Sequence, residues 1–251
     1  MSAPNLIRSS AVMASGTVLS RITGVARDVA MTAALGFYIV SDAYSLGNTM
    51  PNVLYILIAG GALNAVFIPQ LVRKMKEDAG GGAAYADRLL TITGVTLLVF
   101  SIAAVLAAPL LVDLYATASY NDEQRELATA FARLCLPQIF FYGVYTLIAQ
   151  VLNSRGRFGP PMFAPIANNI VAIATFVLFL VIAGTSAAAD GKLSTDQILL
   201  LGIGTTLGVV VQALILLPTM WRTGYHWRPR FDWRNAGLGK AGKLAAWTIG
   251  L

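Results

Sequence analysis

The chain carries little charge, a single cysteine and a single histidine. Only 12% of its 251 residues are charged, whereas soluble globular proteins average about 25%. The lone Cys135 cannot form an intrachain disulfide. With His226 as the only histidine, the chain lacks the residues for a His/Cys metal site and for Ser-His-Asp or Cys-His catalysis. We therefore expect no metal, no cofactor and no catalytic residues, and a membrane-embedded enzyme is the weakest interpretation.

Apolar runs recur along the whole chain, which is 57% hydrophobic with a mean hydropathy of +0.68. A membrane-crossing helix needs about 20 apolar residues. The runs predict an all-α polytopic membrane protein with six transmembrane helices and the start of a seventh. The predicted spans are 10–37, 42–72, 89–114, 127–152, 163–184 and 198–221, with a further helix beginning at 242. The first run exceeds the roughly 7–15 apolar residues of a signal peptide, so we expect no cleavage.

The basic residues fall mostly in short loops between the predicted spans. A net charge of +6 alone could suggest nucleic-acid binding, but this placement is typical of topology signals, so we expect no nucleic acid. The outer loops are acidic and carry only Arg125 and Lys192 as cations, which predicts a cytoplasmic N-terminus in the plasma membrane.

The predicted domain organisation follows the same pattern. We expect a six-helix unit at 1–221, a basic interfacial linker at 222–241 and the start of a seventh helix at 242–251. The segment around the linker is rich in arginine and tryptophan. It fits a loop that contacts anionic membrane lipids, or a docking site for an acidic partner.

Charged residues lie inside the first span, where each costs at least about 2.5–3.5 kcal/mol at membrane depth. Arg21, Gly24 and Asp28 share one helix face, whereas Arg27 is rotated away from it. Asp28 therefore cannot neutralise both arginines along one stripe. Because arginine stays protonated, we expect a positive charge that faces a polar cavity. Gly24 would allow a close neighbour or a bend.

The second span also has a polar face. Its members are Asp42, Ser45, Thr49 and Asn52. Asn48 adds a further polar group, and Pro51 removes a backbone hydrogen bond within the stripe. Gly60 and Gly61 follow, so we expect this helix to be bent or locally unwound, as in transporters with broken helices that line a cavity.

A second interpretation of these charges stays open, because Arg21 could pair with Asp28 or Asp42 and hold two helices together. Further polar residues end the fourth span or begin the fifth: Gln150, Asn153, Asn168 and Asn169. Interhelical hydrogen bonding is the favoured interpretation for this group.

Several segments together resemble a known family. They are SRITGVARD at 20–28, SDAYSLGNTMPN at 41–52, GGALNAVFIPQ at 60–70 and the long run 136–170. The chain is similar to the opening half of the MurJ (MviN) lipid II flippase family, most closely its actinobacterial members. The resemblance implies the fourteen-helix multidrug/oligosaccharidyl-lipid/polysaccharide (MOP) exporter fold, in which two six-helix lobes surround a cationic cavity. It maps the family's first-helix arginines onto Arg21 and Arg27, and an acidic residue onto Asp42.

The chain also departs from the family pattern. Tyr55 and Ile56 stand where many members have two arginines, and Gly60 stands where they have glutamate. The chain would supply only the first lobe, so the second lobe would be a missing partner. Actinobacterial members can carry a cytoplasmic pseudokinase, which makes a cytoplasmic regulatory partner possible.

The predicted function is translocation of lipid II from the inner to the outer leaflet by alternating access. The predicted cavity residues are Arg21, Arg27, Asp28, Asp42, Asn48 and Asn52, and the predicted hinge positions are Gly24, Pro51, Gly60 and Gly61. The arginines would attract the pyrophosphate, and Asp28 or Asp42 would compete for them when the site is empty. The alternatives are a polysaccharide-unit flippase or drug antiporter of the same superfamily, and a non-transporting scaffold or inactive half.

Overall fold

A computed structural model describes residues 3–37, 39–62, 83–116, 120–184, 188 and 191–231 of the chain. The described segments are helical and contain no strand, which confirms the all-α prediction. The helices are α1 (Ala3–Leu35), α2 (Ile39–Ala62), α4 (Ala83–Leu106), α5 (Ala108–Tyr115), α6 (Asp122–Cys135), α7 (Gln138–Ser154), α8 (Gly159–Ala183), α9 (Thr195–Leu214) and α10 (Leu217–Arg222). The predicted seventh helix and the end of the second span lie outside the described residues.

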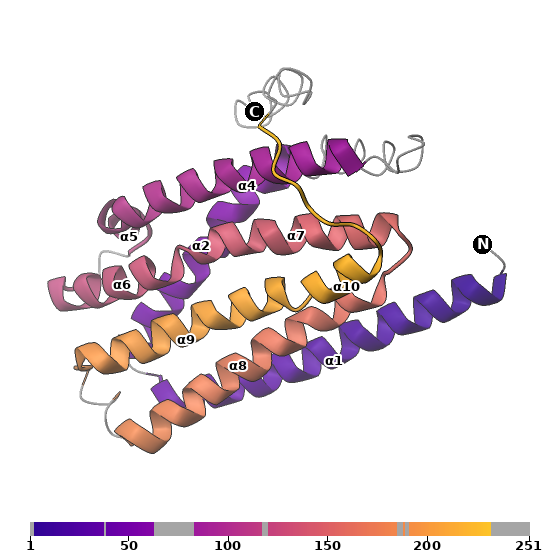
Figure 1. The fold of residues 1–251 in the computed structure, drawn as a ribbon. Coiled ribbons are helices and arrows are strands. Elements are labelled where there is room, and N and C mark those ends of the chain that lie inside the picture. Colours follow the sequence, from indigo (N-terminus) through magenta and orange to yellow (C-terminus); the bar gives the residue numbers. More distant parts are fainter. Residues whose placement is uncertain are drawn as a thin grey trace.

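Three predicted spans are each built from two consecutive helices, at positions where the sequence prediction had one continuous helix. The breaks fall between α4 and α5, between α6 and α7, and between α9 and α10. Pro109, Pro137 and Pro218 lie at these breaks. Proline lacks an N–H and its ring clashes with the preceding turn. The polypeptide therefore begins a new helix near each proline, and α7 and α10 continue in the general direction of α6 and α9 (Figure 1).

At the break before α7 the regular helical hydrogen-bond pattern is interrupted, and side chains of other helices donate to the backbone carbonyls there. The Ser101 hydroxyl donates to the Leu136 carbonyl at 3.3 Å, and the Thr206 hydroxyl donates to the Leu134 carbonyl at 2.7 Å. Such side-chain donors are what makes a broken helix tolerable at membrane depth.

The predicted unwinding of the second span is not seen. α2 continues as an α-helix through Pro51, Gly60 and Gly61, and α1 continues through Gly24. Neighbouring helices pack against both, and a single missing backbone bond does not end a helix that is held in this way.

Four segments are long and apolar enough to cross a membrane: Ala83–Leu106, Asp122–Ser154, Gly159–Ala183 and Thr195–Arg222. Each matches one of the predicted spans. α1 and α2, which carry the polar stripes, fall outside this group. The polarity that distinguishes these two helices is therefore the feature that needs a functional explanation.

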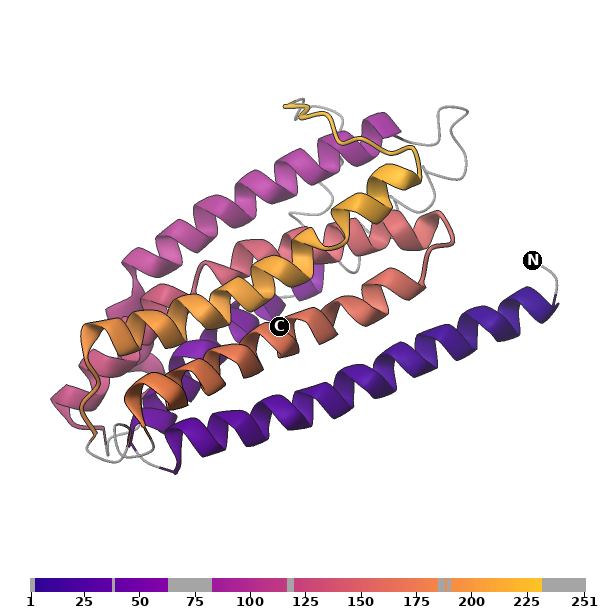
Figure 2. The same ribbon diagram turned by 60° about the horizontal axis from the view of Figure 1, so that its bottom comes forward.

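The helices lie side by side, and α1 lies at the edge. It packs along α8, which packs in turn on α9, while α7 lies between α9 and α4 (Figures 1 and 2). Gly16 allows the close contact of α1 with α8, because a Cβ there would stand 2.9 Å from the Cβ of Met162. The side of α1 away from α8 bears an exposed apolar row, namely Val18, Ile22, Val25 and Val29.

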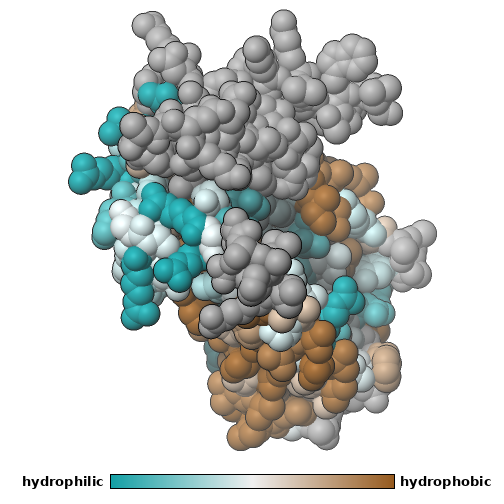
Figure 3. Space-filling model, turned by 90° about the vertical axis from the view of Figure 1, so that its right-hand side faces the viewer, coloured by the Kyte–Doolittle hydropathy of each residue, from teal (hydrophilic) through white to brown (hydrophobic). Residues whose placement is uncertain are grey.

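The two ends of the bundle differ in charge. At the end where α1 and α4 begin and α7 and α10 finish, called here the basic end, lie Arg155, Arg157, Arg222, Arg228 and Arg230. At the opposite, acidic end lie Asp42, Asp113, Asp122, Glu123, Glu126 and Asp196. Seen from the basic end, hydrophilic and hydrophobic side chains gather on separate parts of the surface (Figure 3).

Candidate functional site

A pocket of about 420 Å³, part of it open to solvent, lies where α1, α2, α7, α8 and α9 meet. Its lining residues are Arg27, Asp28 and Met31 of α1, Tyr44 and Asn48 of α2, Gln138 and Tyr142 of α7, Asn168, Ala172 and Phe176 of α8, and Thr205 and Val209 of α9. Most of these residues are polar, yet they lie within helices that are otherwise apolar. The pocket thus supplies the polar place that charged residues in the first span require.

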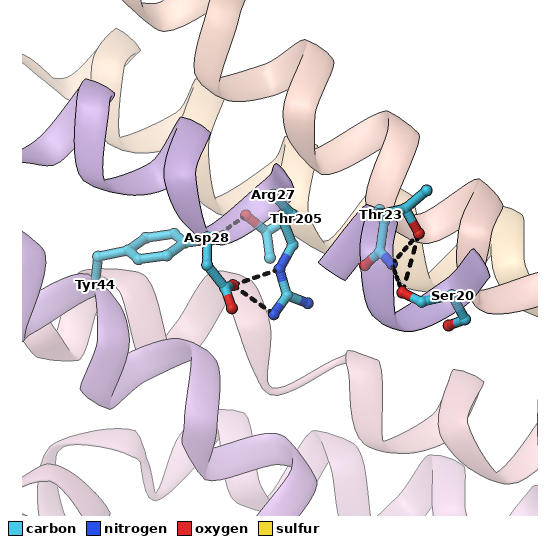
Figure 4. Close-up of polar contacts among 7 residues, drawn as sticks. Ser20, Thr23, Arg27, Asp28, Tyr44 and Thr205 are labelled. Atoms are coloured by element: carbon cyan, nitrogen blue, oxygen red, sulfur yellow. Dashed lines mark hydrogen bonds and ion pairs between the residues drawn. The ribbon is translucent and has the colours of Figure 1, made fainter. Parts of the chain in front are cut away.

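Arg27 and Asp28 are the charged residues of the pocket lining. The guanidinium donates to Asp28 Oδ1 from Nη2 at 2.8 Å and from Nε at 3.1 Å (Figure 4). The two side chains are 39% and 59% exposed. An ion pair this accessible contributes little stability, because water screens it. It can therefore be opened at small cost by a competing anion.

The ion pair corrects the helix-phase argument made from sequence. That argument placed Arg27 away from the stripe of Asp28, and also raised a pair between Arg21 and Asp28 or Asp42. The long guanidinium instead reaches across the backbone to its neighbour in sequence. Arg21 is exposed and, within the described part of the chain, makes no ion pair or hydrogen bond. One arginine is thus left unneutralised, as the sequence argument expected.

Neutral hydrogen-bonding groups make up the rest of the polar wall. The Tyr44 hydroxyl lies 2.7 Å from Thr205 Oγ1 (Figure 4). The Tyr142 hydroxyl donates to Gln138 Oε1 at 3.1 Å, and Gln138 Nε2 donates to Thr206 at 3.1 Å. Asn168 Nδ2 donates to Gln212 Oε1 at 3.0 Å. These bonds link α2, α7, α8 and α9, so they hold the wall opposite Arg27 in a defined shape.

The position of Arg27 is fixed by the contact between α1 and α8. One turn before it, Asn169 Nδ2 donates to Thr23 Oγ1 at 2.9 Å and to the Ser20 carbonyl at 3.1 Å (Figure 4). A Cβ at Gly24 would lie 3.8 Å from the same amide nitrogen, so α8 approaches α1 closely there. The predicted interhelical hydrogen bonding is confirmed for Asn168 and Asn169.

The structure brings only part of the predicted site together. Arg27, Asp28 and Asn48 line the pocket, whereas Arg21 and Asn52 are exposed and lie outside its lining. Asp42 is exposed at the first turn of α2, at the acidic end. It lies near Tyr120: burial mainly, and the charge of Asp42 in addition, raise the pKa of the Tyr120 hydroxyl above its usual value. The roles of Arg21, Asp42 and Asn52 stay predictions.

Sequence reasoning did not single out the pocket residues Tyr44, Gln138, Tyr142 and Thr205. Gln138 carried a usable signal in the sequence, since it is a polar residue inside the apolar run of the fourth span and directly follows Pro137; the structure shows it fully buried. The described residues contain no group of three His, Cys, Asp or Glu side chains able to hold a metal ion. The arrangement instead suits non-covalent binding of a polar group, with one guanidinium paired to one carboxylate and several neutral hydrogen-bonding side chains around them.

Comparison with known proteins identifies the family. The family model for "Lipid II flippase MurJ" matches residues 31–251. The chain is 29% identical over 237 residues to a probable lipid II flippase MurJ of Haemophilus influenzae, covering 91% of this chain and 44% of that protein. It is 33% identical over 176 residues to the lipid II flippase MurJ of Burkholderia cenocepacia, covering 69% and 34%.

A solved structure, lipid II flippase MurJ in an inward closed conformation, has the same fold. The TM-score is 0.70 at 20% identity, over 95% of this chain and 46% of that one. The chain thus spans less than half the length of the relatives it matches. Because the family model covers most of the sequence, the chain belongs to the lipid II flippase MurJ family.

Proposed function

We propose that this chain forms part of a lipid II flippase and binds the substrate's pyrophosphate at Arg27. The observation that carries the proposal is the placement of Arg27 in a pocket where five helices meet, with the exposed Asp28 as its ion-pair partner. The headgroup would move from the inner to the outer leaflet by alternating access while the polyprenyl tail stays in lipid. The chain would then act as a transporter and not as an enzyme.

The chemistry of the pocket supports an anionic substrate. Arginine binds phosphate oxygens through charge-assisted and often bidentate hydrogen bonds. Nε and Nη2 of Arg27 both donate to Asp28 Oδ1. A pyrophosphate would replace this carboxylate, and the neutral donors across the pocket, such as Gln138 and Tyr142, would meet uncharged polar parts of the headgroup. A drug antiporter, which binds cations, would need surplus acid here instead.

Arg21 extends the cationic surface toward the basic end of the bundle. It precedes Arg27 by six residues, about 9 Å along a helix axis, and it is exposed. We assign it to the entry path of the anionic group. With the N-terminus in the cytoplasm of a bacterial cell, this path would begin at the inner leaflet, where lipid II is supplied. We retain the boundaries predicted from the sequence, with the six-helix unit at 1–221 and the linker at 222–241.

Replacing Arg27 tests the proposal. Arg27→Ala, made in the intact gene product, should abolish translocation in a bacterium depleted of its own flippase, measured as lipid II accessible at the outer leaflet. The matched control is Arg125→Ala. Arg125 also forms a 2.8 Å ion pair, with Asp113, and the two side chains are 32% and 59% exposed. It lies at the acidic end and should leave translocation intact. Unimpaired translocation by Arg27→Ala would overturn the proposal.

A further inference from the structure

The segment Thr223–Phe231, called here the strap, leaves α10 and runs back over the bundle to α4. In Figure 1 it is the yellow trace that passes α7 and ends beside α4. It has no regular secondary structure, yet most of its contacts are specific hydrogen bonds to α4 and α7. The proposed transport pocket does not use any of its residues.

The strap is anchored by a buried carboxylate, Asp87, near the start of α4. Asp87 is 3% exposed. Its Oδ1 accepts from the Tyr225 hydroxyl at 2.8 Å and from the backbone N–H of Arg228 at 3.1 Å, and its Oδ2 lies 3.7 Å from Nε of Arg230. A buried charge is tolerated only when it is paired and hydrogen-bonded, and the three partners of this carboxylate among the described residues all belong to the strap. One side chain of α4 therefore fixes the strap at three positions.

Further contacts complete the attachment, among them a hydrogen bond from Trp227 Nε1 to Thr91 Oγ1 at 3.3 Å. The backbone N–H of Arg230 donates to Thr91 Oγ1 at 3.0 Å, one turn beyond Asp87. From the end of α7, Arg155 donates to the Thr223 carbonyl at 2.6 Å and stacks over the Tyr225 ring at 5.3 Å. The backbone of the strap is thus held at its beginning, middle and end.

The outer side of the strap presents aromatic and cationic side chains together. Trp227 and Phe231 are 47% and 64% exposed, and Trp221 at the end of α10 is 48% exposed. Arg222 and Arg228 are exposed, and their guanidinium groups have no partner among residues 3–231 that the structure describes. The strap meets α4 between Asp87 and Thr91, in the first turns of a membrane-crossing helix. Aromatic belts and juxtamembrane cations occupy this level of a bilayer.

We propose that the strap is a binding surface for anionic phospholipid headgroups, and that Asp87 is the positioning residue that holds it at the membrane interface. The charge favours an anionic occupant. The exposed tryptophan and phenylalanine, placed beside the first turns of a membrane span, favour a lipid over an acidic soluble protein. This inference is independent of the transport proposal, because it concerns a different surface and different residues.

Trp227 provides the readout. A variant that keeps Trp227 but changes Trp221, Trp233 and Trp247 to phenylalanine would be reconstituted in phosphatidylcholine vesicles containing either brominated phosphatidylglycerol or brominated phosphatidylcholine. Bromine quenches tryptophan fluorescence at contact, so stronger quenching by the anionic lipid reports its preferential binding. Each basic residue near an anionic surface is worth roughly a five-fold preference. Adding Arg222→Gln and Arg228→Gln should remove most of the preference, whereas Arg125→Gln at the acidic end should leave it unchanged.

The Asp87→Asn variant distinguishes two explanations of the lipid preference, namely a strap held in position by Asp87 and simple attraction by the net charge. The substitution raises the net positive charge, so charge attraction alone predicts a stronger preference for the anionic lipid. The proposal predicts a weaker one, with faster hydrogen exchange of the strap amides, because the anchor is weakened: the Arg230 ion pair is lost, and the bonds from Tyr225 and Arg228 go to a neutral amide oxygen in place of a carboxylate. Equal quenching of Trp227 by both lipids, or a preference that increases in Asp87→Asn, would overturn the inference. The Arg27→Ala variant should keep the lipid preference, which distinguishes this result from a failure of the transport proposal.

Discussion

Two aspartates, one in α1 and the other in α4, are held in opposite ways. The Asp28 side chain is 59% exposed and pairs with one arginine, which is itself 39% exposed. The Asp87 side chain is 5% exposed and binds a hydroxyl, a backbone N–H and a guanidinium of the strap. The open pair can exchange its partner for a ligand, whereas the closed cluster fixes one segment against another. The difference shows which charge is available for binding and which maintains the structure.

The largest effect on stability should come from removing the buried Asp87 carboxylate. Asp87→Ala leaves the Tyr225 hydroxyl and the Arg228 N–H without an acceptor, and a buried donor left unsatisfied costs about 1–3 kcal/mol. We expect a loss of this size in unfolding free energy, measured by denaturant titration in detergent micelles. The control is Asp113→Ala, which removes an exposed carboxylate and should cost under about 1 kcal/mol. Equal losses of unfolding free energy in the two variants would contradict the distinction between the buried Asp87 and an exposed aspartate.

Breaking the exposed Arg27–Asp28 pair should have the opposite outcome, with little loss of stability and a complete loss of translocation. Arg27→Ala should change the unfolding free energy by no more than about 1 kcal/mol, because the pair is screened by water. The same substitution should abolish translocation. Measuring both quantities on one preparation tests the contrast directly. A stability loss comparable with that of Asp87→Ala would mean that the pair is structural.

Tyr225→Phe should have an intermediate effect of about 1 kcal/mol, the usual contribution of one hydrogen bond. Burial first, and then the hydrogen bond to Asp87 and its charge, raise the pKa of the Tyr225 hydroxyl above its ordinary value of 10.0. A raised pKa in the folded state means that the unfolded chain releases this proton first as the pH rises. The stability difference between the natural protein and Tyr225→Phe should therefore be constant below pH 10 and decrease above it. A difference that grows above pH 10 would contradict the assignment.

The smallest effect should come from Thr23→Val, at the contact that positions Arg27. The substitution removes one of two acceptors of Asn169, and the Ser20 carbonyl remains. Interhelical hydrogen bonds in membrane proteins average about 0.6 kcal/mol. A double-mutant cycle with Asn169→Ala should give a coupling energy of this order. A coupling near zero would show that Thr23 and Asn169 do not stabilise the edge position of α1.

Much of the fold could be predicted from run length and charge. The apolar runs located the helices, because a span needs a minimum length of apolar sequence. They did not show that three spans are interrupted, although Pro109, Pro137 and Pro218 mark the interruptions. Proline inside a membrane helix can produce either a kink or a break, and neighbouring side chains decide between them. Pro51, inside the unbroken α2, is the counterexample.

The site was harder to predict than the fold. Helix phase placed Asp28 on the face of Arg21 and away from Arg27, whereas Asp28 lines the pocket together with Arg27, because the argument ignored the reach of a guanidinium to the adjacent carboxylate. The contact of Asp87 with Tyr225 joins positions 138 residues apart. No local pattern indicates such a contact, and Asp87 was not singled out from sequence. Residues that act through long-range packing are the ones that a single sequence conceals.

The edge position of α1 has a mechanical consequence for the pocket. α1 packs mainly along α8, whereas Gln138 and Tyr142, on the opposite wall of the pocket, belong to α7. Arg27 is therefore held to the rest of the bundle chiefly through α8, whereas Gln138 is held through its hydrogen bond to Thr206 of α9. The packing of α8 between α1 and α9 thus sets the distance across the pocket between the guanidinium and the opposite wall.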